Sequence, residues 1–222
     1  MKRCFWVAVV CCISLFCVGI VQAETITYEG DGTSLRQDPL GLGTGDVSVF
    51  PDTPSNNTVI IDYTTGASGT TKPEFVFGGV SVREDVENNT VEIRNGEVAE
   101  EVYGGASEYG SATDNTVSIT GGTVEGYVYG GKSNSGSATG NTVNLSGGTV
   151  DSGGYSSEVV GGESDSGSAT GNTVVITGGT IAGNGYAIGG RSTSGSATDN
   201  TVIMTGGTVG ESVYGGDLPP KN

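Results

Sequence analysis

The sequence predicts an all-β protein, a parallel β-helix (β-solenoid) of about six coils with 26–32 residues per repeat. Two landmarks recur along the chain. Successive Asn-Thr-Val triplets are separated by 32, 26, 26, 31 and 28 residues. Gly-Gly pairs that follow an apolar dipeptide recur at nearly the same intervals. A third observation is apolar alternation with a period of two within each repeat. Repeats of this length are typical of solenoids, in which each unit buries its apolar face against its neighbours.

Each repeat begins with a strand. In 115–120, Val117 and Ile119 alternate with polar Thr116, Ser118 and Thr120, as in a strand with one buried face. Gly121-Gly122 interrupts this strand, and Thr123-Val124 begins a second short strand that we expect to end at Val128-Tyr129. Glycine-rich, β-branched sequence without apolar spacing of 3.6 residues excludes helix.

A polar stretch follows each Gly-Gly pair and ends in Gly-Ser-Ala-Thr. We interpret it as the corner that returns the chain to the next coil. The extra residues of the two longer repeats lie at 151–155 and 182–186, between the two expected strands. Insertions confined to one place predict loops on one edge of the stack, and these are where we expect recognition to lie.

The repeated residues are interpreted as structural ladders along the stack. Six asparagines at coil spacing predict a row of side-chain amides bonded from coil to coil. The residues preceding them are Asn, Asp or Gly, which share tolerance of left-handed turns but not charge or ligating power, so this position predicts a turn. The ladder residues are Asn89, Asn115, Asn141, Asn172 and Asn200, with Gly104, Gly130, Gly161, Gly189 and Gly215.

The N-terminus has the pattern of a secretory signal peptide. Lys2 and Arg3 precede an apolar run from Cys4 to Val21, and cleavage is expected after Ala23. We therefore divide the chain into a signal peptide (1–23), an N-terminal cap or linker (24–56), solenoid repeats (57–216) and a C-terminal tail (217–222). We expect an exported product in the periplasm, at the cell surface or outside the cell.

Composition narrows the possible chemistry. All four cysteines lie in the expected signal, and the chain has no histidine, so the mature part lacks soft and imidazole metal ligands. It carries seven basic and 25 acidic residues, a net charge of 7 − 25 = −18, which is unsuited to nucleic acid or anionic lipid. We expect no cofactor, no metal, no catalytic residue and no membrane insertion of the mature chain.

Three surface features keep other functions open. Carboxylates between Arg83 and Glu101 are compatible with a carbohydrate-active β-helix enzyme or a fragment of one, although strand alternation should scatter them. The threonine rows suggest an ice-binding solenoid, but the residue two places on changes between repeats. The aromatic row at Phe77, Tyr103, Tyr129 and Tyr214 could stack on sugars, but Val160 and Ile188 replace the ring in the two longer repeats, which favours packing.

The motifs Asn-Thr-Val-x-Ile-Thr-Gly-Gly-Thr-Val and Val-Tyr-Gly-Gly follow an export signal. In these motifs the chain resembles the repeat passengers of bacterial autotransporters and related adhesin-like surface proteins. The resemblance covers roughly residues 57–216. It implies export and a structural or adhesive role, with a surface protein or a glycan of the host or the bacterium as the partner. The chain stops at Asn222 without the membrane β-barrel of such proteins, so the resemblance implies a translocator that is separate or missing.

Overall fold

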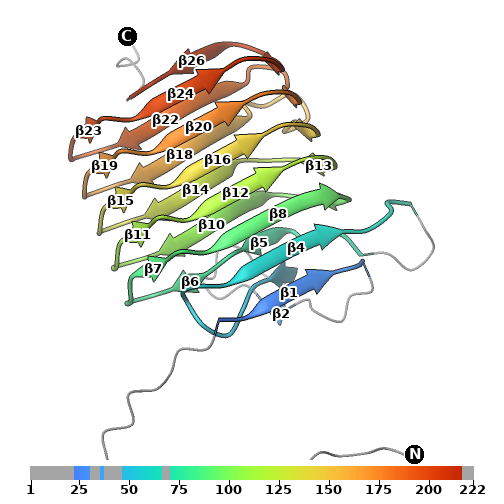
Figure 1. Ribbon diagram of the computed structural model, residues 1–222, viewed down its shortest axis with the longest axis horizontal. Helices are drawn as coiled ribbons and strands as arrows, with labels where there is room; N and C mark the ends of the chain where they lie inside the picture. Colours follow the sequence, from blue (N-terminus) through green and yellow to red (C-terminus); the bar gives the residue numbers. More distant parts are fainter. Residues whose placement is uncertain (1–22, 31–35, 38–46, 67–70, 217–222) are drawn as a thin grey trace, which may run out of the picture.

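The computed structural model describes residues 23–30, 36–37, 47–66 and 71–216. In this part of the chain every regular element is a strand. The strands form four sheets that wind into a stack of about six coils, which confirms the predicted β-solenoid. Figure 1 shows the coils following one another from the N-terminal to the C-terminal end. Almost all of the expected signal peptide (1–22), parts of the expected cap (31–35 and 38–46) and the tail (217–222) lie outside the described residues.

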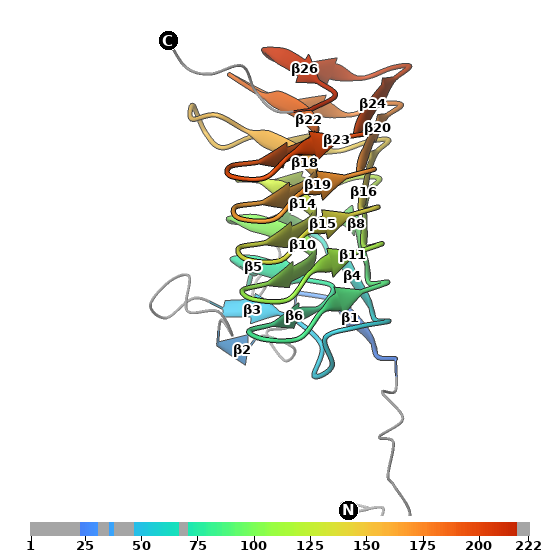
Figure 2. The ribbon, with the colours of Figure 1, turned by 90° about the vertical axis from the view of Figure 1, so that its left-hand side faces the viewer.

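Two large sheets form opposite walls of the solenoid, as Figure 2 shows from the side. Sheet A contains β1 (Thr25–Tyr28), β4 (Thr58–Asp62), β8 (Thr90–Asn95), β12 (Thr116–Ile119), β16 (Thr142–Leu145), β20 (Thr173–Ile176) and β24 (Thr201–Met204). Sheet B contains β2 (Arg36–Gln37), β3 (Val47–Val49), β5 (Phe75–Phe77), β6 (Val80–Ser81), β10 (Glu101–Ser107), β14 (Val128–Ser133), β18 (Glu158–Ser164), β22 (Tyr186–Ser192) and β26 (Ser212–Tyr214).

Two narrow sheets close the coil between these walls. Sheet C contains β7 (Val86–Glu87), β11 (Ala112–Thr113), β15 (Ala138–Thr139), β19 (Ala169–Thr170) and β23 (Ala197–Thr198). Sheet D contains β9 (Glu97–Val98), β13 (Thr123–Val124), β17 (Thr149–Val150), β21 (Thr180–Ile181) and β25 (Thr208–Val209). A complete coil therefore has four short strands. The expected second strand is divided at Glu125-Gly126, and the expected Gly-Ser-Ala-Thr corner ends in a strand of sheet C.

The strands pair in parallel and in register from coil to coil. Val117 lies between Val91 and Val143, and Ile119 lies between Ile93 and Leu145. Only β2 and β3 form an antiparallel pair among the described strands. The N-terminal region contributes more than the cap that we expected, because β1 pairs with β4 and β3 pairs with β5.

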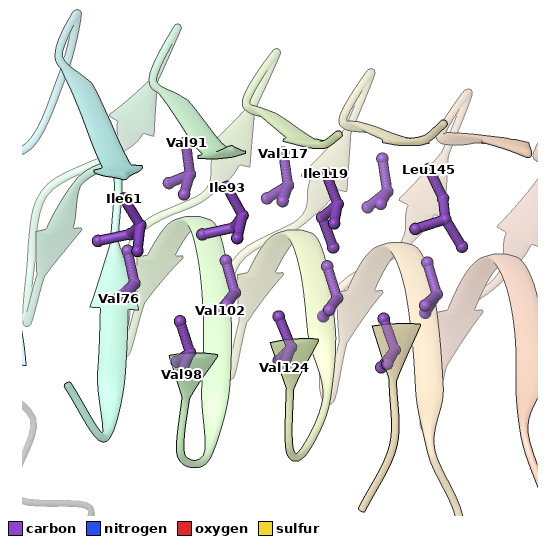
Figure 3. Close-up of a cluster of buried hydrophobic side chains, with 14 of the residues drawn as sticks. Ile61, Val76, Val91, Ile93, Val98, Val102, Val117, Ile119, Val124 and Leu145 are labelled. Carbon is purple, nitrogen blue, oxygen red and sulfur yellow. The ribbon is translucent and has the colours of Figure 1, made fainter. Parts of the chain in front are cut away.

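The interior is a continuous column of aliphatic side chains (Figure 3). Sheet A supplies two residues per coil, such as Val117 and Ile119, while Val124 of sheet D and Val128 of sheet B complete the same coil. All four are fully buried. Since one coil cannot enclose these side chains alone, burial stabilises the coils only when they stack.

A row of asparagine amides runs beside this column. The Oδ1 atom of Asn141 accepts hydrogen bonds from the backbone N and the Nδ2 atom of Asn115, each at 3.0 Å. The Nδ2 atom of Asn115 also donates to the carbonyl oxygen of Val86 at 2.9 Å. The same pattern links Asn57, Asn89, Asn115, Asn141, Asn172 and Asn200.

The residue before each asparagine has the left-handed backbone that the comparison of repeats predicted. Its φ angle lies between 53° and 65° in every repeat, at Asn56, Asn88, Asp114, Gly140, Gly171 and Asp199. This confirms the turn interpretation. The turn carries the chain from sheet C into sheet A and directs the following amide inward.

The Gly-Gly pairs provide the space that this row requires. A β-carbon on Gly104 would lie 2.3 Å from the carbonyl oxygen of Gly130 in the next coil. One on Gly105 would lie 2.5 Å from Cγ of Asn115. The first glycine therefore lets two backbones approach, and the second lets the amide fit against the strand.

The same glycine substitution at two coils tests this interlock. We expect Gly105→Ala to lower the free energy of unfolding by about 2 kcal/mol, because its methyl group displaces the buried amide. Gly216→Ala is the matched control, since a β-carbon there has its nearest neighbour, the Ala197 carbonyl oxygen, at 3.8 Å. Urea unfolding followed by circular dichroism measures both. Equal losses of unfolding free energy in the two variants would contradict this account, because they would show that contact with the amide is not what excludes a side chain at residue 105.

Candidate functional site

Most of the predicted ladder residues lie inside the stack, whereas Asn200 is half-buried and Gly215 is exposed at the C-terminal coil. Asn115 is fully buried, and both hydrogens of its amide and its Oδ1 atom are engaged by neighbouring coils. The Gly-Gly pairs adjoin these amides. The buried amides from Asn89 to Asn172 use their hydrogen-bonding groups within the stack, so we look for a functional site on the outer faces and the loops.

The threonine rows lie on two different sheets, one that includes Thr116 on sheet A and one that includes Thr123 on sheet D. Thr116 is in register with Thr90 and Thr142, so one row is regular. The next row changes from coil to coil, through Glu92, Ser118, Asn144, Val175 and Ile203. The register therefore places side chains of different size and charge beside the threonines, and the face is not a flat array of threonine alone.

The aromatic row on sheet B is packed rather than exposed. The rings of Phe77 and Tyr103 stack with centroids 4.9 Å apart, and those of Tyr103 and Tyr129 with centroids 5.2 Å apart. Tyr103 and Tyr129 are only 3% and 4% exposed. Val160 and Ile188 extend the same buried cluster, which confirms the packing interpretation over a sugar-stacking strip.

A network of ion pairs lies beside this row. Lys132, Glu163 and Arg191 occupy adjacent rungs of sheet B. Lys132 Nζ lies 3.0 Å from Glu163 Oε1 and 4.6 Å from the centroid of the Tyr129 ring. Arg191 contacts Glu163 and also pairs with Glu158, with 2.8 Å between Nη1 and Oε2. These charges satisfy one another and hold three coils together.

The network changes the pKa of its central carboxyl. Burial alone would raise the pKa of Glu163, but the charges and hydrogen bonds of Lys132 and Arg191 outweigh it and hold this pKa below its ordinary value. The pKa of Glu101 shifts in the opposite direction. Burial raises its pKa, against the opposing effects of a hydrogen bond from the Tyr103 hydroxyl and the charge of Lys132.

A hollow opens beside the first insertion, at the edge where sheet D meets sheet B. Its volume is about 560 Å³. Three successive coils contribute to it. Its lining includes Ala99, Glu100, Glu101, Thr123, Glu125, Gly126, Tyr127, Asp151, Ser152, Gly153 and Tyr155. We call it the acidic hollow.

The insertion loop that borders the acidic hollow has an ordered backbone. The backbone N of Ser152 donates to Ser157 Oγ at 2.9 Å, and that of Gly153 donates to Asp151 Oδ1 at 3.0 Å. Gly153 and Gly154 both have positive φ, 65° and 106°. These contacts join the start of the loop to its end, and Tyr155 near its tip is 78% exposed.

Comparing the repeats with one another located this insertion, but it did not identify the side chains that surround it. The carboxylates between Arg83 and Glu101 are spread over several sheets, as we expected, with Glu87 on sheet C and Glu92 on sheet A. Glu100 and Glu101 line the same hollow as Asp151 of the insertion. Tyr127 comes from the coil between them. The register of the repeats could have predicted this grouping. It places Val98, Val124 and Val150 on adjacent rungs, and it therefore aligns the residues that follow them.

The described part of the chain contains no cluster of three or more acidic, histidine or cysteine residues arranged to hold a metal ion. The same residues include no helix that is both long and apolar enough to span a membrane. Comparisons of the chain with models of known protein families, with curated proteins and with solved structures found no match.

Stability measurements test the ion-pair network. We expect Glu163→Gln to lower the free energy of unfolding at pH 7 by about 2 kcal/mol, because two partly buried cations lose their shared carboxylate. The exposed Glu84→Gln is the control, with an expected change within about 0.5 kcal/mol.

The effect of Glu163→Gln should also depend on pH. The pKa of Glu163 is lowered in the folded chain, so its contribution is complete above the unfolded pKa of about 4.3 and is lost as pH falls through the folded pKa. Urea unfolding at pH 7 and at successively lower pH measures this. A difference between wild type and Glu163→Gln that stays constant down to pH 2 would contradict the assignment.

Proposed function

We propose that this chain is exported through the general secretory route and acts outside the cytoplasm as a structural or adhesive β-solenoid. In this respect it would be comparable to the repeat passenger of a bacterial autotransporter. The observation that carries the proposal lies at the boundary of the expected signal. The backbone N of Glu24 donates to Asn57 Oδ1 at 3.0 Å, and the carbonyl oxygen of Glu24 accepts from the backbone N of Thr58 at 2.8 Å.

Glu24 therefore stands at the asparagine position of the coil that precedes Asn57. Cleavage after Ala23 would release an amino group that can keep this bond, and it would leave β1 (Thr25–Tyr28) intact. The expected cleavage position and the first residue bonded into the ladder coincide. This coincidence supports an exported product whose solenoid begins at its own N-terminus.

A structural or adhesive role is supported by how the repeated residues are used. The asparagines and glycines are engaged in holding the coils together, and the aromatic row is buried. The features that depart from the repeat are the insertions, and the first of them borders the acidic hollow. A stable stack that presents a variable edge is suited to contact with a partner.

Export is tested by expressing the complete chain in a secretion-competent bacterium. We expect a product whose N-terminal sequence begins at Glu24, found in the periplasm or the medium. The matched control is Ile13→Arg with Leu15→Arg, which interrupts the apolar run and should leave the precursor in the cytoplasm. A wild-type chain that stays unprocessed in the cytoplasm would contradict the proposal.

The non-enzymatic role is tested with the purified mature protein and polygalacturonate. We expect neither new reducing ends nor unsaturated uronates, which are the products of hydrolysis and of elimination. Turnover that is abolished by replacing a single carboxylate would favour the carbohydrate-active enzyme and overturn this part of the proposal.

A further inference from the structure

The acidic hollow combines a cavity, an ordered loop and two tyrosine rings with carboxylates, and no lysine or arginine lines it. We propose that it binds a lysine or arginine side chain presented by a basic segment of a partner protein. The inference deepens the proposed adhesive function and rests on it for the existence of a partner. It concerns only the described residues of this chain.

The shape of the acidic hollow follows from three adjacent rungs. The backbone N of Glu125 donates to the carbonyl oxygen of Val98 at 2.8 Å, and that of Asp151 donates to Val124 at 2.9 Å. Ala99, Glu125 and Asp151 are therefore successive residues of one row. The short side chain of Ala99 leaves room at one end of this row, and the insertion rises at the other.

The charge of the acidic hollow is only partly neutralised. Glu125 is paired with Lys72, whose Nζ lies 2.6 Å from Glu125 Oε2. Among the described residues, neither Glu100 nor Asp151 forms an ion pair with a lysine or arginine. Like charges on one surface repel, and a bound cation placed between them relieves this repulsion.

The carboxyl of Glu101 also favours a cation in the acidic hollow. It is partly buried and bonded to the Tyr103 hydroxyl, and burial raises its pKa. A cation in the acidic hollow would stabilise the charged form of this group.

The tyrosines give the acidic hollow a surface that a cation or its alkyl stem can contact. Tyr127 is half-buried and packs at a tilt against Tyr129, with ring centroids 6.3 Å apart. Tyr155 is among the most exposed large side chains of the described chain. Aromatic faces attract cations within about 6 Å, and tyrosine is enriched at protein interfaces.

The loop presents Tyr155 without needing a partner to order it. Ser157 is fully buried, and its Oγ atom lies 3.2 Å from Ser152 Oγ in addition to accepting from the Ser152 backbone N. A binding surface that is already ordered loses less conformational entropy on binding.

A basic segment fits better than a neutral glycan. Several carboxyl-bearing residues line the acidic hollow, and the mature chain carries a net charge of −18, so long-range attraction also favours a cationic partner. The second insertion offers an internal comparison. Its residues 182–186 are Ala-Gly-Asn-Gly-Tyr, which carry no charge. The half-buried ring of Tyr186 stacks on Tyr214 with centroids 6.4 Å apart, whereas Tyr155 is exposed.

The test uses the mature chain from Glu24 to Asn222 and a fluorescein-labelled hexalysine peptide, with binding followed by fluorescence anisotropy. We expect Glu100→Gln with Asp151→Asn to weaken binding about fivefold, since each exposed charge contributes modestly. Tyr155→Ala should weaken it about threefold through the lost ring. Because both substitutions are at partly or highly exposed positions, thermal unfolding should stay at the wild-type temperature.

The matched control is Glu84→Gln with Asp85→Asn, which removes the same two charges elsewhere. Both residues are exposed, and an asparagine at 85 keeps the oxygen that accepts from the backbone N of Ser111 at 2.7 Å. We expect this control to change hexalysine binding by less than about twofold, because salt screens distant surface charges.

Three outcomes would overturn the proposal. Equal weakening by the two double substitutions would assign binding to the acidic surface as a whole. Failure of hexalysine to bind would exclude a cation site and leave the export test unaffected. Binding of cellohexaose instead, with its loss in Tyr155→Ala, would assign the acidic hollow to a neutral glycan.

Discussion

The structure depends on the interlock between one buried asparagine and one Gly-Gly pair in each coil. The amide joins its coil to the next through the backbone and the side chain together, as Asn115 does with Asn141. It fits only because Gly105, on the facing strand, has no side chain. A buried amide with unmet hydrogen bonds would be costly, so each coil must place the next amide in the same position. This requirement fixes the cross-section of the stack.

The interlock also determines where the chain can vary. The insertions follow the short strands of sheet D, where the chain turns towards sheet B away from the amide row. Extra residues there leave the register of both neighbouring sheets unchanged, since Val128 pairs with Val159 across the first insertion. The outer face of sheet B is restricted in another way. Lys132, Glu163 and Arg191 on that face pair with one another, whereas Glu100 and Asp151 line the acidic hollow at the edge of sheet D beside the exposed Tyr155.

The sequence predicted the solenoid and its turns because both depend on short-range patterns. Alternation identified the strands of sheet A, and exchange among Asn, Asp and Gly identified a left-handed turn. The division of the expected second strand was missed, since Glu125-Gly126 has no breaker signal beyond one glycine. The contribution of β1 was missed because Glu24 replaces the asparagine that marks other coils. The acidic hollow joins residues of three coils, and only the lateral register brings Glu100, Tyr127 and Asp151 together.

Amide hydrogen exchange, followed by nuclear magnetic resonance, tests the interlock most directly. The backbone N–H groups of Asn89, Asn115 and Asn141 each donate to the amide of the next coil. If this row holds the stack together, they should exchange only on unfolding of the stack, as slowly as Val117 and Ile119 of β12. Rapid exchange at these asparagines while Val117 and Ile119 remain protected would contradict the account.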